Sequence, residues 1–319
     1  MQAYVIRRIL LLIPTFIILT MLVFLSVRLI PGDVVDATMA QLEFDMQDID
    51  REKVERMLGL DKPIYVQYLN WVGGIVLEGT LGDSFMGSFK VEERIAGRFR
   101  VTLELGLISI IIALIIAIPV GIYSAVRQDT AGDYAGRSLA VLGLATPNFW
   151  LATIVLIYPA IWWAWAPPTD LVYFLDNPLK NIWLYTIPGL ILGTAMSAGT
   201  MRMTRTMMLE VLRQDYIRTA WSKGLRERMI ILRHVIRNAL IPVVTLIGMQ
   251  IPIIIGGSVI IENLFALPGL GRLAVNALID RDYPVVSGVN LIFATLVMAL
   301  NLAVDILYAF LDPRVQHGQ

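Results

Sequence analysis

The residues that most often perform catalysis or bind metals are scarce in this chain. It contains no cysteine and only two histidines, His234 and His317. The absence of cysteine excludes disulfides, thiolate metal sites and cysteine nucleophiles. An intramembrane enzyme would need a Ser–His pair, paired aspartates or a histidine metal site, and no such set is present. We therefore expect no catalytic residues and no metal site.

A few polar residues lie within or beside strongly apolar segments. Asp305 follows Asn301 by about one helical turn inside the last of these segments. An aspartate at mid-bilayer costs ~2.5–3.5 kcal/mol on insertion scales, which makes it a functional candidate by default. Asp305 is only about two turns from Asp312, so a structural bond to a neighbouring helix is favoured. Glu262 and Asn263 end another apolar segment, where they either line a gate or pathway or simply cap the helix.

One polar stretch, residues 202–238, has the pattern of a docking element rather than of a catalytic site. Two short amphipathic helices are predicted on either side of Gly224, because glycine takes positive φ and ends a helix cleanly. Lys223 falls in the last turn of the first helix, where a cation complements the helix dipole. Such a pair suits either the groove of another protein or a surface of anionic lipid.

The elements that must position these residues are apolar helices. Hydrophobic residues make up 57% of the 319 residues and charged residues 16%, against roughly 45–50% and about 25% in soluble domains. A helix that crosses a bilayer needs about 20 mostly apolar residues. About six segments qualify: 9–30, 101–126, 138–163, 182–201, 239–261 and 286–311. The predicted fold class is an all-α membrane protein, with kinks at internal prolines such as Pro147.

The distribution of basic residues predicts the orientation of these spans. Segment 202–237 has nine Lys/Arg and three acidic residues, whereas segment 31–100 has eight Lys/Arg and thirteen acidic residues. Basic loops stay in the cytoplasm, so 202–238 is predicted to be cytoplasmic and 31–100 external. Residues 1–30 are then an uncleaved first helix with a cytoplasmic start, 101–312 a five-helix core, and 313–319 a cytoplasmic tail. Both termini are predicted to be cytoplasmic.

The external segment is predicted to be a small, mostly helical subdomain. Apolar residues at helical spacing, with acids before them and Gly59 after them, predict a helix over 48–58. A second helix is predicted over 64–77, and the glycine-rich stretch 78–87 is expected to be a loop.

The run Asp215-Tyr216-Ile217-x-x-Ala220-x-x-Lys223-Gly224-Leu225 resembles the coupling loop of binding-protein-dependent ABC permeases, in their dipeptide/oligopeptide/nickel branch. The resemblance extends in order along the chain and fits the subunit with the large external loop after its first helix. The other similar stretches are Tyr4–Leu10, Arg28–Asp33, Leu58–Pro63 with Gln67-Tyr68, Gly79–Ser84, Phe265–Arg272, Arg281–Val286 and Asp312–Arg314.

The chain departs from the wider superfamily signature at three places. That signature begins Glu-Ala-Ala, where this chain has Arg218-Thr219-Ala220, and its later Leu-Pro is replaced by Ile236-Arg237. The peptide branch shows similar departures. Trp221-Ser222 stands where smaller or basic residues are expected, which leaves the docking contacts open.

The resemblance implies a type I ABC importer permease in a bacterial or archaeal cytoplasmic membrane. Its implied partners are a second homologous permease, two ATP-binding-cassette ATPases, an external substrate-binding protein and membrane lipid, with no nucleic acid. The coupling loop, with Asp215, Tyr216, Ala220, Lys223, Gly224 and Leu225, would bind the ATPases. ATP and Mg²⁺ would reside on those partners, since the sequence lacks a Gly-x-x-x-x-Gly-Lys-Ser/Thr loop. No cofactor is expected on this chain, and solute would cross by alternating access.

The sequence leaves alternatives open for the substrate class and for the kind of protein. The resemblance implies peptides as the first substrate class, with nickel or short oligosaccharides as alternatives. A secondary transporter working alone would show inverted repeats and polar ion sites near mid-bilayer, and the sequence shows no repeat. The sequence does not exclude a non-transport scaffold, but the resemblance disfavours it.

Overall fold

The computed structural model describes residues 2–29, 35, 39, 51–57, 59–87 and 89–311. Within these residues the chain is helical, and its one extended feature is an isolated bridge between Asp83 and Lys90. Contacts divide the chain into two units. Of the described residues, the first unit contains 103–267 and 300–311, and the second contains those between 2 and 102 together with 268–299. The longest helices of the first unit are α5 (Val91–Val126, from Leu103 onward), α8 (Pro178–Leu212) and α11 (Ile236–Leu264).

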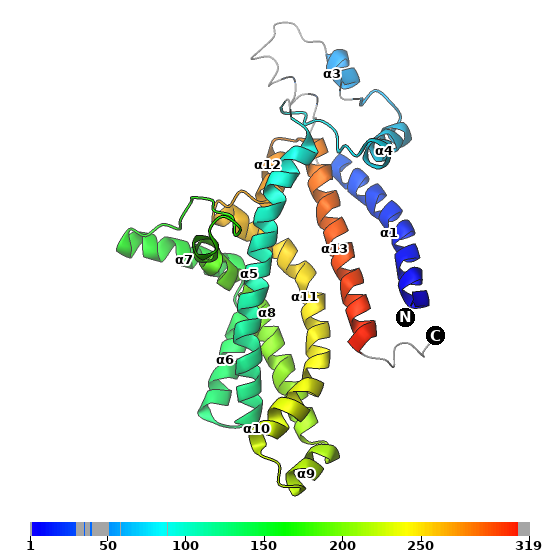
Figure 1. Cartoon of the computed structure of the whole chain (residues 1–319). Helices are drawn as coiled ribbons and strands as arrows, with labels where there is room; N and C mark the ends of the chain where they lie inside the picture. Colours follow the sequence, from blue (N-terminus) through cyan, green and yellow to red (C-terminus); the bar gives the residue numbers. More distant parts are fainter. Residues whose placement is uncertain are drawn as a thin grey trace. The chain divides into compact units, whose positions relative to one another are not determined.

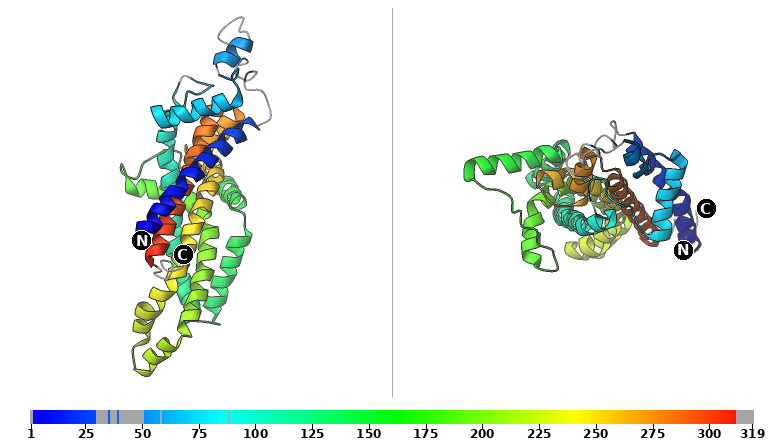
Figure 2. Two further views of the ribbon diagram at one scale, coloured as in Figure 1. Left: turned by 90° about the vertical axis from the view of Figure 1, so that its right-hand side faces the viewer. Right: turned by 90° about the horizontal axis from the view of Figure 1, so that it is seen from above.

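In the first unit, α8 packs against both α11 and α6 (Ala131–Ala145), as Figures 1 and 2 show. Small residues allow these helices to approach closely. A Cβ atom on Gly193 of α8 would lie 2.7 Å from the backbone oxygen of Ser109 on α5. A Cβ atom on Gly121 of α5 would lie 2.8 Å from the backbone oxygen of Met201 on α8. The α5–α8 contact therefore brings the two backbones together without intervening side chains.

The segment expected to form a single third span is broken in two. Helix α6 ends at Ala145, α7 (Asn148–Trp163) begins three residues later, and the two are bent by 96°. The physical reason is Pro147, which has no N–H to donate and disfavours helical geometry at Thr146, whose φ and ψ are −94° and 117°. Among the residues that the structure describes, five helices are long and apolar enough to span a bilayer, and the predicted six are reached when this bent pair counts as one.

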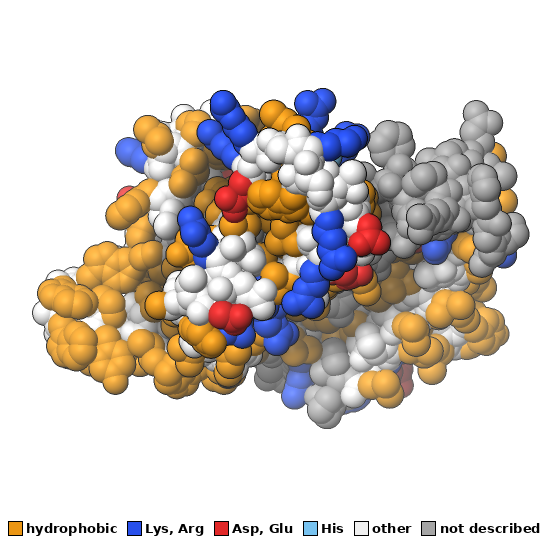
Figure 3. Space-filling view, turned by 90° about the horizontal axis from the view of Figure 1, so that it is seen from below, with side chains coloured by type: hydrophobic (Ala, Val, Ile, Leu, Met, Phe, Trp, Pro, Cys, Tyr) orange, Lys and Arg blue, Asp and Glu red, His pale blue; other side chains and the backbone are white. Residues whose placement is uncertain are grey.

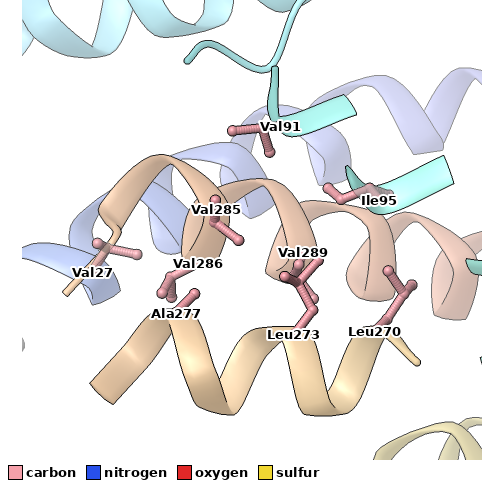
Figure 4. Packing of buried hydrophobic residues seen from close by; sticks show 9 residues of the cluster. All are labelled: Val27, Val91, Ile95, Leu270, Leu273, Ala277, Val285, Val286 and Val289. Carbon is pink, nitrogen blue, oxygen red and sulfur yellow. The ribbon is translucent and has the colours of Figure 1, made fainter. Parts of the chain in front are cut away.

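The second unit is held together by an apolar cluster from four helices, shown in Figure 4. Val27 comes from α1 (Gln2–Arg28), and the other residues come from the start of α5, from α12 (Leu270–Ile279) and from the start of α13 (Tyr283–Leu311). The hydroxyl of Thr102 accepts a hydrogen bond from the N–H of Leu270 at 2.8 Å, which satisfies one free donor at the start of α12.

Loop 79–87 is fixed to this cluster through Asp282, which is 4% exposed. Its carboxylate accepts hydrogen bonds from the hydroxyl of Ser84 and, at 3.1 Å, from the N–H of Phe85. Burial raises the pKa of Asp282, and the two accepted hydrogen bonds act in the opposite direction.

The helices expected in segment 31–100 are present where the structure describes them. Helix α3 spans Arg51–Met57, within the predicted 48–58, and the remaining residues of that prediction lie outside the described ranges. Helix α4 (Ile64–Gly73) continues as a π-helical turn, η1 (Gly74–Glu78). This pair matches the helix predicted over 64–77, and 79–87 is a loop as expected. The predicted tail, 313–319, lies outside the described residues.

Candidate functional site

The 202–238 segment folds as the end of α8, a short helix α9 (Asp215–Ser222), a turn and the start of a second long helix. Helix α9 ends in a Schellman motif. Gly224 takes φ +75° and donates its N–H to the carbonyl of Trp221 at 2.9 Å, while Leu225 donates to the carbonyl of Ala220 at 3.4 Å. Lys223 is the C-cap residue, so the predicted helix stop at Gly224 is confirmed and Lys223 lies one position beyond the last turn.

A buried cluster, called here the α9 seat, holds this helix in place. Ile217 and Ala220 of α9 are 0% and 8% exposed and pack among residues of four neighbouring elements. Leu225, the residue after Gly224, packs on the same cluster, as is common for a Schellman motif. The other buried members are Ala125 of α5, Met208 of α8, Ile230 and Val235 of η2, and Ala239 of α11.

The second part of the segment differs from the prediction of two short helices. The helix that begins at Glu227 passes through α10 (Glu227–Met229) and a π-helical stretch, η2 (Ile230–Val235), into α11. It is therefore one continuous apolar helix, Glu227–Leu264. The extra residues of the π turn let both Ile230 and Val235 reach the α9 seat, so tertiary packing favours continuity over a break.

A hydrogen bond joins α9 to α11 on the exposed side of the seat. The amide of Asn238 donates to the hydroxyl of Tyr216 at 2.9 Å and to the carbonyl of His234 at 2.9 Å. Together with the seat, this bond links α9 to the continuous helix Glu227–Leu264 at two places.

The outward face of α9 and of the turn after it is amphipathic. Tyr216 and Trp221 are each 45% exposed, so two aromatic rings are presented to the surroundings. Lys and Arg side chains gather on this face around apolar side chains (Figure 3), and the exposed basic residues of the segment are Arg202, Arg213, Arg218, Lys223, Arg226, Arg228, Arg233 and Arg237. The surface offers aromatic anchors and positive charge, which suits a partner groove that is apolar at its centre and acidic at its rim.

Among the predicted site residues, the structure brings Ala220 and Leu225 into the seat. Asp215 is exposed and pairs with Arg218 at 3.3 Å, a contact that contributes little to stability. Lys223 is the C-cap of α9, and Gly224 turns the chain after it with its positive φ. Neither residue belongs to the apolar cluster.

The four predicted intramembrane polar residues do not come together as one site. Glu262 is fully buried near the end of α11, and the amide of Asn263 donates to the carbonyl of Val259 in its own helix at 2.8 Å. Asn301 is exposed on α13 and Asp305 is half-buried one turn later. Their roles as gate, pathway or structural residues remain predictions.

Sequence reasoning missed a buried ion pair between α6 and α8. Asp133, which is 0% exposed, accepts hydrogen bonds from Arg205 Nε at 2.9 Å and Nη2 at 2.8 Å, and another from the hydroxyl of Ser124. The backbone N–H of Asp129 donates to the same carboxylate at 3.0 Å. The only sequence signal was an acid four residues before Arg137, which resembles an ordinary exposed helix pair.

In the described parts of the chain, no three His, Asp or Glu side chains gather in a way that could hold a metal ion.

Comparison with known sequences gives consistent results along the chain. A family model described as "Binding-protein-dependent transport system inner membrane component" matches residues 117–317, and its N-terminal counterpart matches residues 1–106. The chain is 42% identical over 321 residues to the oligopeptide transport system permease protein AppB of Bacillus subtilis, covering 99% of this chain and 100% of that protein. It is 38% identical over 343 residues to the dipeptide transport system permease protein DppB of Escherichia coli, covering 99% of each.

Solved structures show the same fold at much lower identity. An inward-facing form of the MetNI methionine ABC transporter matches with a TM-score of 0.56 and 15% identity, over 69% of this chain and 97% of that one. An amino acid ABC transporter crystallised with histidines matches with a TM-score of 0.54 and 13% identity, over 68% of this chain and 94% of that one. The expected fold of a type I importer permease is confirmed.

Proposed function

Because the chain belongs to the family of binding-protein-dependent transport system inner membrane components, we propose that it is the membrane subunit of an ATP-driven importer of peptides. The observation that carries the substrate class is the end-to-end similarity to oligopeptide and dipeptide permeases. The same similarity favours peptides over the nickel and oligosaccharide alternatives.

The partners follow from this assignment. The chain would pair with a second, homologous permease, bind two ATPase subunits on one side of the membrane and receive solute from a binding protein on the other. ATP and Mg²⁺ would be held by the ATPases. The excess of Lys and Arg in 202–237 supports a cytoplasmic position for that segment and, with it, for both termini.

Helix α9 and the turn at Gly224 would form the contact with an ATPase. Tyr216 and Trp221 would fill an apolar groove of that partner, while Lys223 and neighbouring arginines meet acidic residues at its rim. Asp215 would lie at the edge of the contact. Ala220 and Leu225 would not touch the ATPase; they would hold α9 in position by packing on the α9 seat.

The geometry supports a mechanical link between this contact and the membrane helices. Helix α9 is packed on the seat and hydrogen-bonded to Asn238, which lies in the continuous helix Glu227–Leu264. A displacement of α9 by the closing ATPases would therefore move the start of that helix with it. Packed elements shift as rigid bodies between a few discrete arrangements, which is what alternating access requires.

The proposal is tested by purifying the tagged chain in mild detergent from its own membrane and identifying what comes with it by mass spectrometry. We expect a second permease and two ATPase subunits, and the reconstituted complex should take up tri-alanine only with ATP and the binding protein. Recovery of the chain alone, with solute movement in liposomes without ATP, would refute the proposal and favour a secondary transporter.

A further inference from the structure

A cavity of about 300 Å³ lies in the first unit where the break between α6 and α7 meets α8 and α11. Most of its wall is apolar, with Leu192 and Met196 of α8 and Ile253 of α11 among the lining residues. Two amide side chains also line it, Asn148 at the first position of α7 and Gln250 at the middle of α11. No charged residue is among those that line it.

Neither of these amides has a hydrogen-bond partner in the part of the chain that the structure describes. Two other amides on the long helices of this unit do donate hydrogen bonds: that of Asn181 to Glu104 at 2.6 Å and that of Asn263 to Val259 at 2.8 Å. An amide left unpaired in hydrocarbon costs several kcal/mol. Two unpaired amides that face one cavity at the depth of the spans therefore indicate a hydrated space rather than a lipid-filled one.

The backbone around the cavity also indicates that the space is hydrated. The 96° break between α6 and α7 interrupts a helix near the middle of its apolar length. Irregular backbone at membrane depth is tolerated only where it is buried in protein or lines a water-filled cavity. On the opposite wall, Gly199 of α8 has no side chain, and a Cβ atom there would lie 3.5 Å from the amide nitrogen of Gln250. That distance is an ordinary van der Waals contact, so Gly199 leaves unfilled a space that a Cβ atom would occupy beside the amide.

We propose that this cavity is a section of the solute pathway, and that Asn148 and Gln250 bind the backbone amides of a passing peptide; this inference rests on the proposed function. Each side-chain amide both donates and accepts, so it pairs with a peptide group of either orientation. The uncharged polar groups and apolar walls suit the feature that all peptides share, their backbone, and do not select among charged side chains.

The first test uses the absence of native cysteine. Gln250→Cys and Asn148→Cys are compared with Ile115→Cys, which lies on α5 outside this cavity and is 66% exposed along an apolar helix. A charged methanethiosulfonate reagent is attacked only by the thiolate, which forms in water, and yields a mixed disulfide with loss of methanesulfinate. We expect the two cavity positions in the assembled complex to react at least about tenfold faster than Ile115→Cys. Equal rates at the three positions would overturn the proposal.

The second test measures transport by the reconstituted complex. The double variant Asn148→Leu/Gln250→Leu should lower ATP-driven uptake of tri-alanine by about fivefold for each amide removed, the factor that one ordinary hydrogen bond contributes. Assembly and ATP hydrolysis stimulated by the binding protein should be retained. The matched control is Thr153→Val/Thr245→Val, on the same two helices, because those hydroxyls already donate to Phe149 and Ile241 in their own helices.

The two possible failures are distinguishable. If the wild-type complex takes up no tri-alanine with ATP, the proposed function fails. If the wild type transports and the double leucine variant transports equally well, only the pathway assignment fails.

Discussion

Gly224 allows a sharp test of how the turn after α9 serves the contact with an ATPase. Its φ of +75° lies in the left-handed region, and a Cβ atom built there meets nothing within 4 Å. A substitution at this position therefore causes no clash within the chain. Its cost comes from the backbone conformation alone, and so it depends on which side chain is introduced.

The magnitudes follow from the left-handed conformation. An ordinary L-residue there costs roughly 1–2 kcal/mol, and a β-branched residue falls at the upper end or beyond. Asparagine tolerates this region far better, although its volume is close to that of valine. A cost of about 2 kcal/mol changes the population of the seated turn by a factor of about 30. We therefore expect the loss of ATPase binding to increase in the order Gly224→Asn, Gly224→Ala, Gly224→Val.

The assay titrates the purified ATPase subunit onto the permease pair in nanodiscs and then measures ATP-driven uptake. Gly224→Val should weaken binding of the ATPase by about 30-fold, and Gly224→Asn by less than about threefold. Insertion of the chain in the membrane should be unchanged, because the strain is confined to one exposed turn.

Two glycines serve as controls. Gly79 also has a positive φ, +69°, with open space around it, but lies in the second unit. Gly256 has open space in α11 without a positive φ. Neither Gly79→Val nor Gly256→Val should weaken ATPase binding. If Gly224→Asn and Gly224→Val weaken ATPase binding equally, the cause is side-chain volume at the interface and the backbone argument is wrong. Wild-type ATPase binding by Gly224→Val would also contradict it.

Three further predictions concern packing, charge and pH. Ile217→Ala should destabilise the α9 seat by about 2–4 kcal/mol and expose α9 to protease, whereas Thr219→Ala on the exposed side should change stability by less than about 0.5 kcal/mol; equal proteolysis of the two variants would contradict the seat. Asp133→Leu should lower thermal stability by roughly 3–5 kcal/mol, and adding Arg205→Met should restore most of it, because the single change leaves a charge unpaired; additive losses would show that the pair is not coupled. Burial raises the pKa of Asp282 above its ordinary value of about 3.9, so folding favours the protonated form and stability of the second unit should fall as pH rises through that raised pKa; hydrogen exchange against pH should show this slope, and a wild-type slope in Asp282→Asn would exclude Asp282 as its source.

Much of the fold could be predicted from local sequence because the bilayer imposes strong one-dimensional rules. A long apolar run forms a helix in hydrocarbon, since a helix satisfies the backbone hydrogen bonds within the run itself. The end of α9 was predictable for the same kind of reason, because glycine is the residue that enters the left-handed region at little cost. The run of residues around Gly224 also pointed to the family that the comparisons then showed.

Other features depended on contacts between residues far apart in the sequence. The helix after Gly224 reads as a short amphipathic piece, and only the packing of Ile230 and Val235 on the α9 seat makes it continuous with α11. The pairing of Asp133 with Arg205 joins residues 72 positions apart, and neither residue has a local pattern that signals it. The two side chains meet only because α6 packs along α8.

The sequence by itself determined that this chain crosses a membrane, which apolar segments are helical and which family it resembles, since each depends on composition, hydropathy or a contiguous motif. The tertiary structure decided which polar residues are satisfied and which are not. Asn148 and Gln250 are 102 positions apart and read as ordinary polar residues in apolar helices. The 96° break at Pro147 and the packing of α8 on α11 bring both amides to one cavity. A side chain's hydrogen-bond partners are set by its neighbours in space, and those neighbours are fixed only when the helices pack.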